Sequence, residues 1–320
     1  MTFDTNKIAI IVPLYNDAAN IERAVLSALS QEAPAGYSIE IHIVDDCSSD
    51  NGPAIARRLA DNHDQVFFLQ QDMNMGPSAA RNLALETTDA AWFTPLDSDD
   101  IIEPRRIARL LEIALREEMD LVADNLLISM ESTPDKAERP LWPGKPEGVV
   151  ALTASLFVER SFDVEIPRSE LGYLKPLINR VSTHLGARPY IDALRFGEDF
   201  ELYTRMLLNG AKACLVDPLG YYLVCREGSA SHTQSGRDHE RLARISRQML
   251  KHPGIPPAAK SALRRHAIYS EKEAAWWRMI DAVKQRNPGL MVSAFAFSPA
   301  ASLHVIGNLG KEVIRRSKPA

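Results

Sequence analysis

Residues 8–12 read Ile-Ala-Ile-Ile-Val and are followed by Pro13. A short, uninterrupted apolar run is typical of a strand buried on both faces, as the strands of a parallel sheet are. Residues 18–31 then place apolar side chains at near-helical spacing and stop before a break at Pro34 and Gly36. The chain therefore opens with a predicted strand and a predicted helix.

The same alternation continues as far as residue 96. We expect further strands at 39–44, 66–69 and 90–96, and helices at about 52–62 and 78–87. Strands that alternate with helices are joined by right-handed crossovers, so the pattern predicts an α/β fold with a mostly parallel central sheet flanked by helices. Ligands of such sheets bind beyond the carboxyl ends of the strands.

The alternation weakens after about residue 100. Residues 105–119 have a helical pattern, and 131–148 are rich in Pro, Glu, Lys and Gly, which predicts a loop. From about residue 236 the chain has helical character. We therefore expect one domain over 1–235, with halves at about 1–103 and 104–235, and a helical C-terminal extension over 236–320.

Composition excludes several classes of protein. The chain has 320 residues, of which 45% are hydrophobic and 25% charged, as in ordinary globular proteins. A net charge of −5 argues against nucleic acid as a partner. The three cysteines, Cys47, Cys214 and Cys225, match neither a disulfide framework nor a zinc site. Without a signal-peptide pattern or a long apolar segment, we expect a cytoplasmic protein, at most peripheral at the inner face of the membrane.

Acidic residues follow the predicted strand at 90–96. Asp97, Asp99 and Asp100 would converge at the end of that strand. Mg²⁺ and Mn²⁺ prefer oxygen ligands and are often held by one or two carboxylates together with substrate phosphates, so the cluster predicts a divalent cation site. An Asp-rich turn that caps the next helix is the alternative. The presence of polar clusters at neighbouring strand ends favours the metal site.

Three further polar residues lie at the ends of predicted strands or starts of helices. Asp45 and Asp46 end the strand at 39–44, where a carboxylate can accept a hydrogen bond from a nucleobase N–H or form part of an Asx turn. Arg81 lies in the helix at 78–87. Its guanidinium suits phosphate or carboxylate, so it could orient the metal-binding carboxylates, contact a diphosphate, or face solvent.

Two candidates lie later in the chain. Glu198 and Asp199 open a predicted helix, where one of them could act as a general base or both could simply interact with the helix dipole. His232 lies in a polar loop after the strand-like residues 219–224. It could bind a metal or a phosphate, or be a surface side chain.

Taken in order, five motifs resemble those of family 2 glycosyltransferases, which have the GT-A fold. The motifs are Ile-Ile-Val-Pro-Leu-Tyr-Asn at 10–16, Val-Asp-Asp-Cys-Ser-Ser-Asp at 44–50, Asn-Met-Gly to Ala-Arg-Asn at 74–82, Leu-Asp-Ser-Asp-Asp at 96–100, and Gly-Glu-Asp-Phe-Glu-Leu at 197–202. The resemblance covers about residues 7–235. It implies a Rossmann-like GT-A sheet, with the nucleotide-sugar half first and the acceptor half second.

The resemblance also implies roles for individual residues. By this resemblance Asp199 is the catalytic base, and Asp99 and Asp97 bind Mg²⁺ or Mn²⁺, with His232 as a further candidate ligand. The residues expected to bind the nucleotide are Pro13, Tyr15, Asn16, Asp45, Asp46, Arg81, Asp97 and Lys175. Within this set, Pro13, Tyr15 and Asp45 would hold the base and ribose, and Lys175 would approach the phosphates.

A narrower likeness concerns the stretches 171–176 and 226–232, which are similar to bacterial exopolysaccharide transferases of the succinoglycan type. Many family members have His where this chain has Cys225, and His232 could compensate. The implied activity is that of an inverting, metal-dependent hexosyltransferase that moves a sugar from a UDP-sugar to a hydroxyl of a glycan or lipid-linked acceptor. The alternative is a non-catalytic module that binds a sugar nucleotide or a glycan. Because no G-x-G-x-x-G follows the first strand, a dehydrogenase is disfavoured.

The C-terminal region combines apolar and basic residues. Trp276 and Trp277 precede a mostly apolar stretch at 290–309, and Lys311, Arg315, Arg316 and Lys318 follow it. A helix of this composition could lie on an anionic membrane surface. It could equally pack on the catalytic domain and leave a solvated basic tail.

Overall fold

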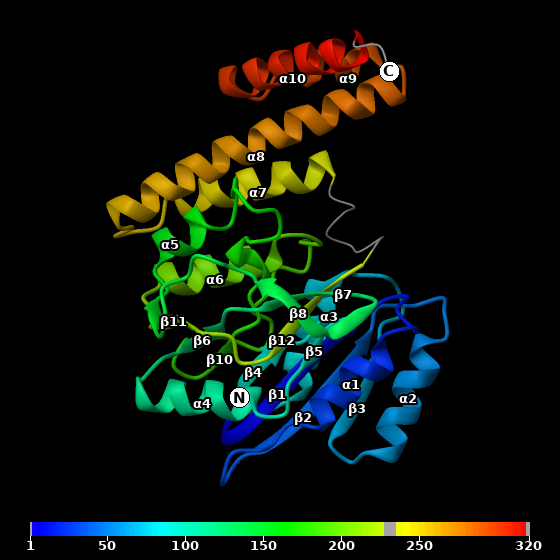
Figure 1. The fold of residues 1–320 in the computed structure, drawn as a ribbon, viewed down its shortest axis with the longest axis vertical. Helices are drawn as coiled ribbons and strands as arrows, with labels where there is room; N and C mark the ends of the chain where they lie inside the picture. Colours follow the sequence, from blue (N-terminus) through cyan, green and yellow to red (C-terminus); the bar gives the residue numbers. More distant parts are fainter. Residues whose placement is uncertain (1, 227–234, 318–320) are drawn as a thin grey trace. The chain divides into compact units, whose positions relative to one another are not determined.

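The computed structural model describes residues 2–226 and 235–317, with side chains described as far as Lys311. The chain divides into two compact units (Figure 1). The sheet unit comprises Met1–Phe157 and Val164–Glu227, and the helical unit comprises Val158–Asp163 and Gly228–Ala320. His232 lies outside the described residues.

An eight-stranded sheet forms the centre of the sheet unit, with the strand order β3-β2-β1-β4-β10-β6-β11-β9. Its first four strands in the chain are β1 (Asp4–Leu14), β2 (Ser38–Asp45), β3 (Val66–Gln70) and β4 (Ala90–Pro95). They pair in parallel, with Ile10 opposite Ile41 and Thr94. The predicted mostly parallel sheet is therefore confirmed.

The other half of this sheet is mixed. Its strands are β6 (Leu121–Asp124), β9 (Val150–Ala151), β10 (Leu177–Asn179) and β11 (Ala213–Val216). β6 and β11 are parallel to each other, whereas β10 is antiparallel to both of its neighbours, β4 and β6. A short reversed strand thus joins the two halves of the sheet.

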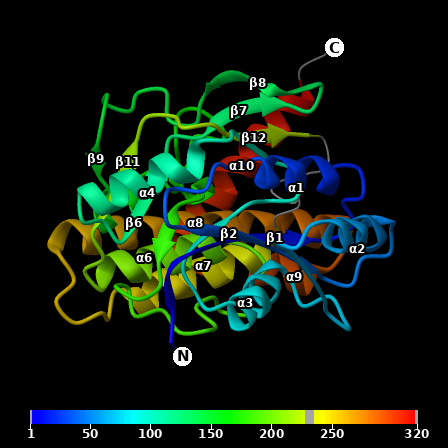
Figure 2. The ribbon, with the colours of Figure 1, turned by 90° about the horizontal axis from the view of Figure 1, so that it is seen from below.

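Helices cover both faces of the sheet because each has an apolar stripe. The helices are α1 (Ile21–Leu29), α2 (Gly52–Asn62), α3 (Pro77–Thr87), α4 (Arg106–Arg116), α5 (Ala154–Glu159), the 3₁₀ helix η1 (Leu171–Tyr173) and α6 (Glu198–Leu208). In α1, Ile21, Ala24, Val25 and Ala28 are buried, at the spacing of one helical face. Figure 2 shows α1 and α3 on opposite sides of β1 and β2. This layering leaves the carboxyl ends of the strands for polar residues.

A second, four-stranded sheet has the order β5-β12-β7-β8. It consists of β5 (Ile101–Ile102), β7 (Leu127–Met130), β8 (Thr133–Pro140) and β12 (Tyr221–Cys225). The prediction of a loop over 131–148 is wrong for residues 133–140, which pair with β7. β8 lies at the sheet edge and is mostly exposed, so it needs no alternating apolar pattern and tolerates its two prolines.

The described residues of the helical unit form four helices of different lengths, which confirms the predicted helical C-terminal extension. They are α7 (Gly236–Met249), α8 (Pro257–Lys284), α9 (Pro288–Ser293) and α10 (Pro299–Ser317). α8 contacts both α7 and α10 (Figure 1). The apolar stretch at 290–309, expected as one helix, is divided between α9 and α10, because Pro299 begins a new helix.

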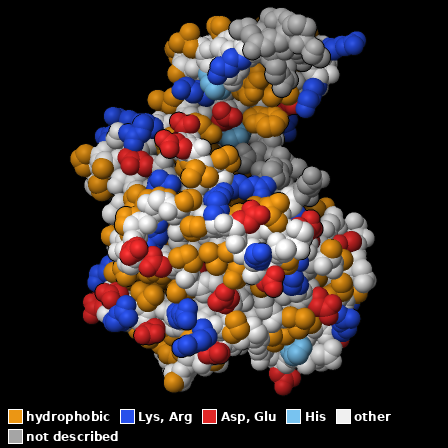
Figure 3. All heavy atoms as spheres, in the orientation of Figure 1, with side chains coloured by type: hydrophobic (Ala, Val, Ile, Leu, Met, Phe, Trp, Pro, Cys, Tyr) orange, Lys and Arg blue, Asp and Glu red, His pale blue; other side chains and the backbone are white. Residues whose placement is uncertain are grey.

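Neither unit carries an obvious membrane-crossing element in its described part, since no helix there is both long and apolar enough to span a bilayer. Figure 3 shows acidic and basic side chains interspersed over the sheet unit on the face that it draws. The charge of that visible face is therefore mixed rather than of one sign.

Candidate functional site

Two buried cations and three carboxylates meet where β4, β10 and α6 approach one another. Lys175 Nζ lies 3.0 Å from Asp97 Oδ2 and 3.0 Å from Asp199 Oδ2. Arg81 donates from Nη2 to Asp97 Oδ1 at 3.0 Å and from Nη1 to Glu198 Oε1 at 2.6 Å. Residues far apart in sequence thus form one continuous ion-pair network, here called the Lys175 network.

The elements fix these five side chains. Asp97 comes two residues after β4 ends, Lys175 lies just before β10, and Glu198 and Asp199 occupy the first turn of α6. Gly197 precedes α6 with φ of 76°, a left-handed conformation that suits glycine. The strand ends therefore present Asp97 and Lys175 to the start of the helix.

Charge within the network offsets the cost of burial. Burial alone would raise the pKa of Asp97, but the charges of Lys175 and Arg81 outweigh it and hold that pKa below its usual range. Burial would likewise lower the pKa of Lys175, yet the carboxylates of Asp199 and Asp97 raise it above its usual value. Asp97 is therefore ionised and Lys175 charged at neutral pH.

Asp199 has different neighbours at its two oxygens. Oδ2 accepts the hydrogen bond from Lys175, whereas Oδ1 has the hydroxyl of Tyr203 at a longer distance of 3.4 Å. The side chain as a whole is buried, with 6% of the residue exposed. A carboxylate held firmly at one oxygen and loosely at the other can accept a proton at the second.

A second charged group surrounds Asp99. Arg226 lies 2.8 Å from Asp99 Oδ2 through Nε and 3.1 Å from Asp17 Oδ1 through Nη1. Ser98 donates from Oγ to Asp17 Oδ2 at 2.6 Å. Burial and the nearby carboxylate of Asp97 raise the pKa of Asp99, although Arg226 opposes the shift. Two carboxylates, those of Asp17 and Asp99, thus share one guanidinium.

This donor set fits a hard divalent cation. Asp97 and Asp99 are only two residues apart, and burial together with the charge of Asp97 raises the pKa of Asp99, a combination that a divalent cation would relieve. In the described part of the chain no three His, Cys, Asp or Glu side chains form a complete metal site. Mg²⁺ is often held by one or two carboxylates while substrate oxygens complete its coordination.

Asp100 differs from its two neighbours in the cluster. Its oxygens accept hydrogen bonds from the hydroxyl of Tyr221 at 2.7 Å and from the backbone N–H of Val224 at 2.8 Å. Burial and the charges of Asp99 and Asp97 raise its pKa well above the usual value. Asp100 therefore ties the end of β4 to β12 instead of facing the other two carboxylates.

The ends of β1 and β2 form the remaining part of the site. Asp45 accepts hydrogen bonds from the backbone N–H of Ser48 and from Gln70. Asp46 accepts from the backbone N–H groups of Met75 and Gly76 at 2.6 and 2.8 Å, and burial raises its pKa. Both carboxylates thereby organise the loops that follow the strands, as an Asx turn does.

Pro13, Tyr15 and Asn16 lie at the end of β1 and in the loop after it. Asn16 has φ of 49°, and its side-chain oxygen accepts from the backbone N–H of Ser49 at 2.7 Å, which joins the loops after β1 and β2. Tyr15 is 52% exposed, an unusual position for a large aromatic ring beside a polar strand end. The ring is accessible to a planar ligand.

The sequence alone did not reveal the partners of these residues. Asp17 directly follows Asn16 and could have been found as another acid at a strand end. Arg226 gave no signal of a contact, because its partner Asp99 lies on a distant element, whereas Tyr203 lies four residues after Asp199 in the same helix and could have been found from that spacing. Cys225 is buried in β12. The proposed role of His232 stays a prediction.

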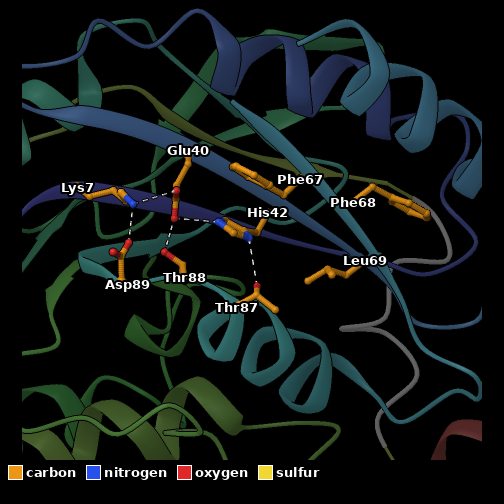
Figure 4. A pocket seen from close by; sticks show the side chains of 9 residues that line it. All are labelled: Lys7, Glu40, His42, Phe67, Phe68, Leu69, Thr87, Thr88 and Asp89. Carbon is orange, nitrogen blue, oxygen red and sulfur yellow. Dashed lines mark hydrogen bonds and ion pairs between the residues drawn. The ribbon is translucent and has the colours of Figure 1, made fainter. Parts of the chain in front are cut away.

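The sheet unit also holds a separate cavity of about 320 Å³, away from the Lys175 network (Figure 4). Figure 4 shows Glu40 between Lys7, Thr88 and His42, and His42 next to Thr87. These residues come from the amino-terminal parts of β1 and β2 and the end of α3. The cavity therefore does not lie at the strand ends where the acidic residues gather.

The chain is similar to known proteins over most of its length. The family described as Glycosyl transferase family 2 matches residues 9–158. The succinoglycan biosynthesis protein ExoU of Rhizobium meliloti (strain 1021) is 29% identical over 98% of this chain and 90% of its own length. ExoO of the same organism, also a succinoglycan biosynthesis protein, is 30% identical over 93% of this chain and 83% of its own length.

Solved structures have the same fold. TarS 1–349 of S. aureus, solved with UDP-GlcNAc, has a TM-score of 0.65 at 20% identity, covering 93% of this chain and 84% of that chain. The mannosyltransferase PcManGT of Pyrobaculum calidifontis, solved with GDP-Man and Mn²⁺, has a TM-score of 0.57 at 17% identity, and the match covers 96% of this chain and 80% of that chain. At these identities the likeness establishes the GT-A fold of the sheet unit.

Proposed function

This chain belongs to glycosyl transferase family 2, and we propose that it transfers a hexose from a UDP-sugar to an acceptor hydroxyl with inversion at the anomeric carbon. The observation that carries the proposal is the Lys175 network, in which Lys175 joins Asp199 to Asp97. It links a buried candidate base to the acidic strand end that characterises a nucleotide-sugar site.

Asp199 is the proposed catalytic base. Its Oδ1 accepts the proton of the acceptor hydroxyl as the hydroxyl oxygen attacks the anomeric carbon and the bond to the nucleoside diphosphate breaks. Lys175 donates to Oδ2 and fixes it, so the oxygen left for the acceptor has a defined direction. Displacement from the opposite face of the sugar inverts its configuration.

The donor side of the proposal rests on the strand ends. Tyr15 offers an exposed aromatic surface to the base, and Asp45 offers a carboxylate, with Pro13, Asn16 and Asp46 shaping the surrounding loops. Because TarS was solved with UDP-GlcNAc, a uridine donor is the first to test. Asp45 and Tyr15 would therefore select the nucleotide.

The leaving group is the diphosphate. Mg²⁺ or Mn²⁺, held by Asp99 and Asp97 and by His232 if that side chain reaches it, would neutralise charge on the departing diphosphate. Arg81 and Lys175 hold Asp97 in place for this purpose. The Mn²⁺ in the PcManGT complex makes a divalent cation a reasonable expectation for this chain.

The biological setting is proposed from the relatives. ExoU and ExoO are both named as succinoglycan biosynthesis proteins, so we expect this chain to act in assembly of an exopolysaccharide or another cell-surface glycan. The acceptor would be a glycan or a lipid-linked saccharide, and the enzyme would meet it in the cytoplasm at the inner face of the membrane.

The test is release of nucleoside diphosphate from a panel of sugar nucleotides, with and without Mn²⁺, by the intact chain and by Asp199→Asn. A matched control is Glu201→Gln, which changes a buried acid of the same helix that pairs with Arg205. We expect release from one donor, lost in Asp199→Asn and kept in Glu201→Gln. Retained release in Asp199→Asn would refute the assignment of the base. Nucleotide binding without release from any donor would favour a binding module.

A further inference from the structure

The segment around α9 and α10 exposes an unusual concentration of apolar side chains. Six of the eighteen large hydrophobic side chains that are exposed in the described part of the chain lie between residues 283 and 306. They are Val283, Met291, Val292, Phe295, Leu303 and Ile306. Val292 and Leu303 are 73% and 70% exposed. Single exposed apolar side chains are ordinary on a protein surface, but a concentration of them is typical of an interaction site.

The same helices are apolar on their packed side as well. Ala294, Ala301 and Val305 are fully buried in a cluster with Ala275 and Met279 of α8. Residues 299–310 contain no charged side chain. α10 also carries the polar residues Ser302, His304 and Asn308, yet apolar side chains occur both on the side that packs on α8 and on the side that stays exposed. Leu303 and Ile306, three residues apart, mark the uncovered side.

The charge of this segment is opposite to that of the rest of the protein. Residues 282–320 contain six basic residues and one acidic residue, a formal charge of +5, and the acid, Glu312, lies beyond the apolar stretch. Because the whole chain carries −5, residues 1–281 carry −10. Lys284 and Arg286 precede α9, and Lys311 and three further basic residues follow the apolar part of α10. The apolar side is thus flanked at both ends by positive charge.

We propose that the uncovered side of α9 and α10 docks on an anionic lipid surface. Apolar side chains enter the boundary between headgroups and acyl chains, and flanking lysines and arginines bind the anionic headgroups. Val292, Leu303 and Ile306 supply the apolar contact, and the +5 charge of the segment supplies attraction and orientation. This inference does not depend on the proposed reaction.

The charge pattern favours lipid over a second copy of the same segment. Such a copy would bring two +5 surfaces together, which disfavours self-association through this side. Residues 1–281 carry −10 and are repelled by an anionic membrane, so the basic segment is the part of the chain that would face the lipid.

The experiment is flotation of the full chain with vesicles of neutral phosphatidylcholine alone or of phosphatidylcholine mixed with phosphatidylglycerol. We expect flotation only with the anionic vesicles, weakened by high salt. Leu303→Glu combined with Ile306→Glu should reduce the bound fraction by about 10-fold or more, because two carboxylates would enter the headgroup region. Leu115→Glu, a change at a 53% exposed leucine of α4, is the matched control and should float as the parent does.

Circular dichroism and release of nucleoside diphosphate in solution show whether each variant folds. Binding that is equal for neutral and anionic vesicles, or that survives the double substitution, would overturn the proposal. Absence of binding by the folded parent chain would do the same. If the double substitution instead abolished a dimer seen by light scattering, the uncovered side would belong to a second copy.

Discussion

Lys175 Nζ lies 3.0 Å from Asp199 Oδ2, and both side chains are buried in the sheet unit. The same ammonium lies 3.0 Å from Asp97 Oδ2, so two of its three N–H donors face carboxylates. Lys175 therefore holds the proposed base, Asp199, and the carboxylate of Asp97 at a fixed separation. The effects of replacing it can therefore be stated in advance.

Lys175→Met should lower kcat by about 10²-fold or more, since a general base that is misplaced loses most of its contribution. Steady-state kinetics with the donor sugar nucleotide measure the loss. Lys7→Met, which breaks the pair with Asp89 far from this network, should leave kcat unchanged. A kcat for Lys175→Met equal to that of the parent chain would argue that the lysine does not position the base.

Asp99→Asn should remove most of the stimulation by Mn²⁺. We expect the rate with Mn²⁺ to fall by about 10²-fold, because several kcal/mol of stabilisation of the leaving diphosphate is lost. Calorimetric titration with Mn²⁺ and UDP gives a readout independent of turnover. The control is Asp100→Asn, since both oxygens of Asp100 are occupied by Tyr221 and Val224. Equal binding of Mn²⁺ by Asp99→Asn and the parent chain would contradict this assignment.

Arg106→Met should destabilise the sheet unit by about 3–5 kcal/mol, because it leaves the carboxylate of Asp124 buried without its counter-charge, with only the backbone N–H of Leu219 still donating to it. Arg106 Nη2 lies 2.7 Å from Asp124 Oδ1, and both side chains are 0% exposed. Urea titration measures the loss. Adding Asp124→Leu should recover much of it, whereas Arg58→Met, which breaks a surface pair with Glu22, should cost about 0–1 kcal/mol. A double variant as unstable as the single one would refute the buried-charge explanation.

Acid should destabilise the helical unit through His266. Burial, with a smaller effect of His239, lowers the pKa of His266 to about 3. The folded state therefore disfavours the proton that the unfolded state binds below about pH 6.5, so the contribution is present above that pH and is lost as pH falls towards 3. We expect about 2 kcal/mol to be lost between about pH 6.5 and pH 5.

The variant His266→Gln isolates this effect. Urea titrations at about pH 7 and about pH 5 should show a shallower loss in His266→Gln than in the parent chain. His184→Gln, which replaces an exposed ring in the sheet unit, should leave the slope unchanged. The same slope in His266→Gln and the parent would assign the acid sensitivity to carboxylates instead.

Much of the fold could be predicted because each strand in the first part of the chain has a hydrophobic pattern of its own. The runs at 8–12, 39–44 and 90–96 lie in strands inside the sheet, where burial favours the continuous apolar pattern that the sequence displays, and the run at 66–69 forms the partly exposed edge strand β3. β8 was missed since an exposed edge strand is defined by its neighbour β7 and not by its own side chains. Local pattern carries no information about such pairing.

The candidate site likewise contains residues that could be predicted from the sequence and contacts that could not. Asp97, Asp99 and Asp199 could be singled out because acids at strand ends and helix starts have a local signature. The contacts of Lys175 and Arg226 could not, since their partners lie on other elements and their spacing in sequence is arbitrary. Lys175 was expected at the phosphates, and its two carboxylate partners emerge only in three dimensions.

The reversed strand β10 has a consequence for the order in which the protein assembles. Ile178 pairs with Phe93 on one side and with Leu121 on the other, so β10 can add only after both of those strands have formed. Pairings between distant residues close slowly. A nascent chain that has completed β1 to β4 already carries its acidic strand end, but lacks the lysine that joins it to Asp199. The Lys175 network is therefore completed only when residues from both halves of the sheet have come together.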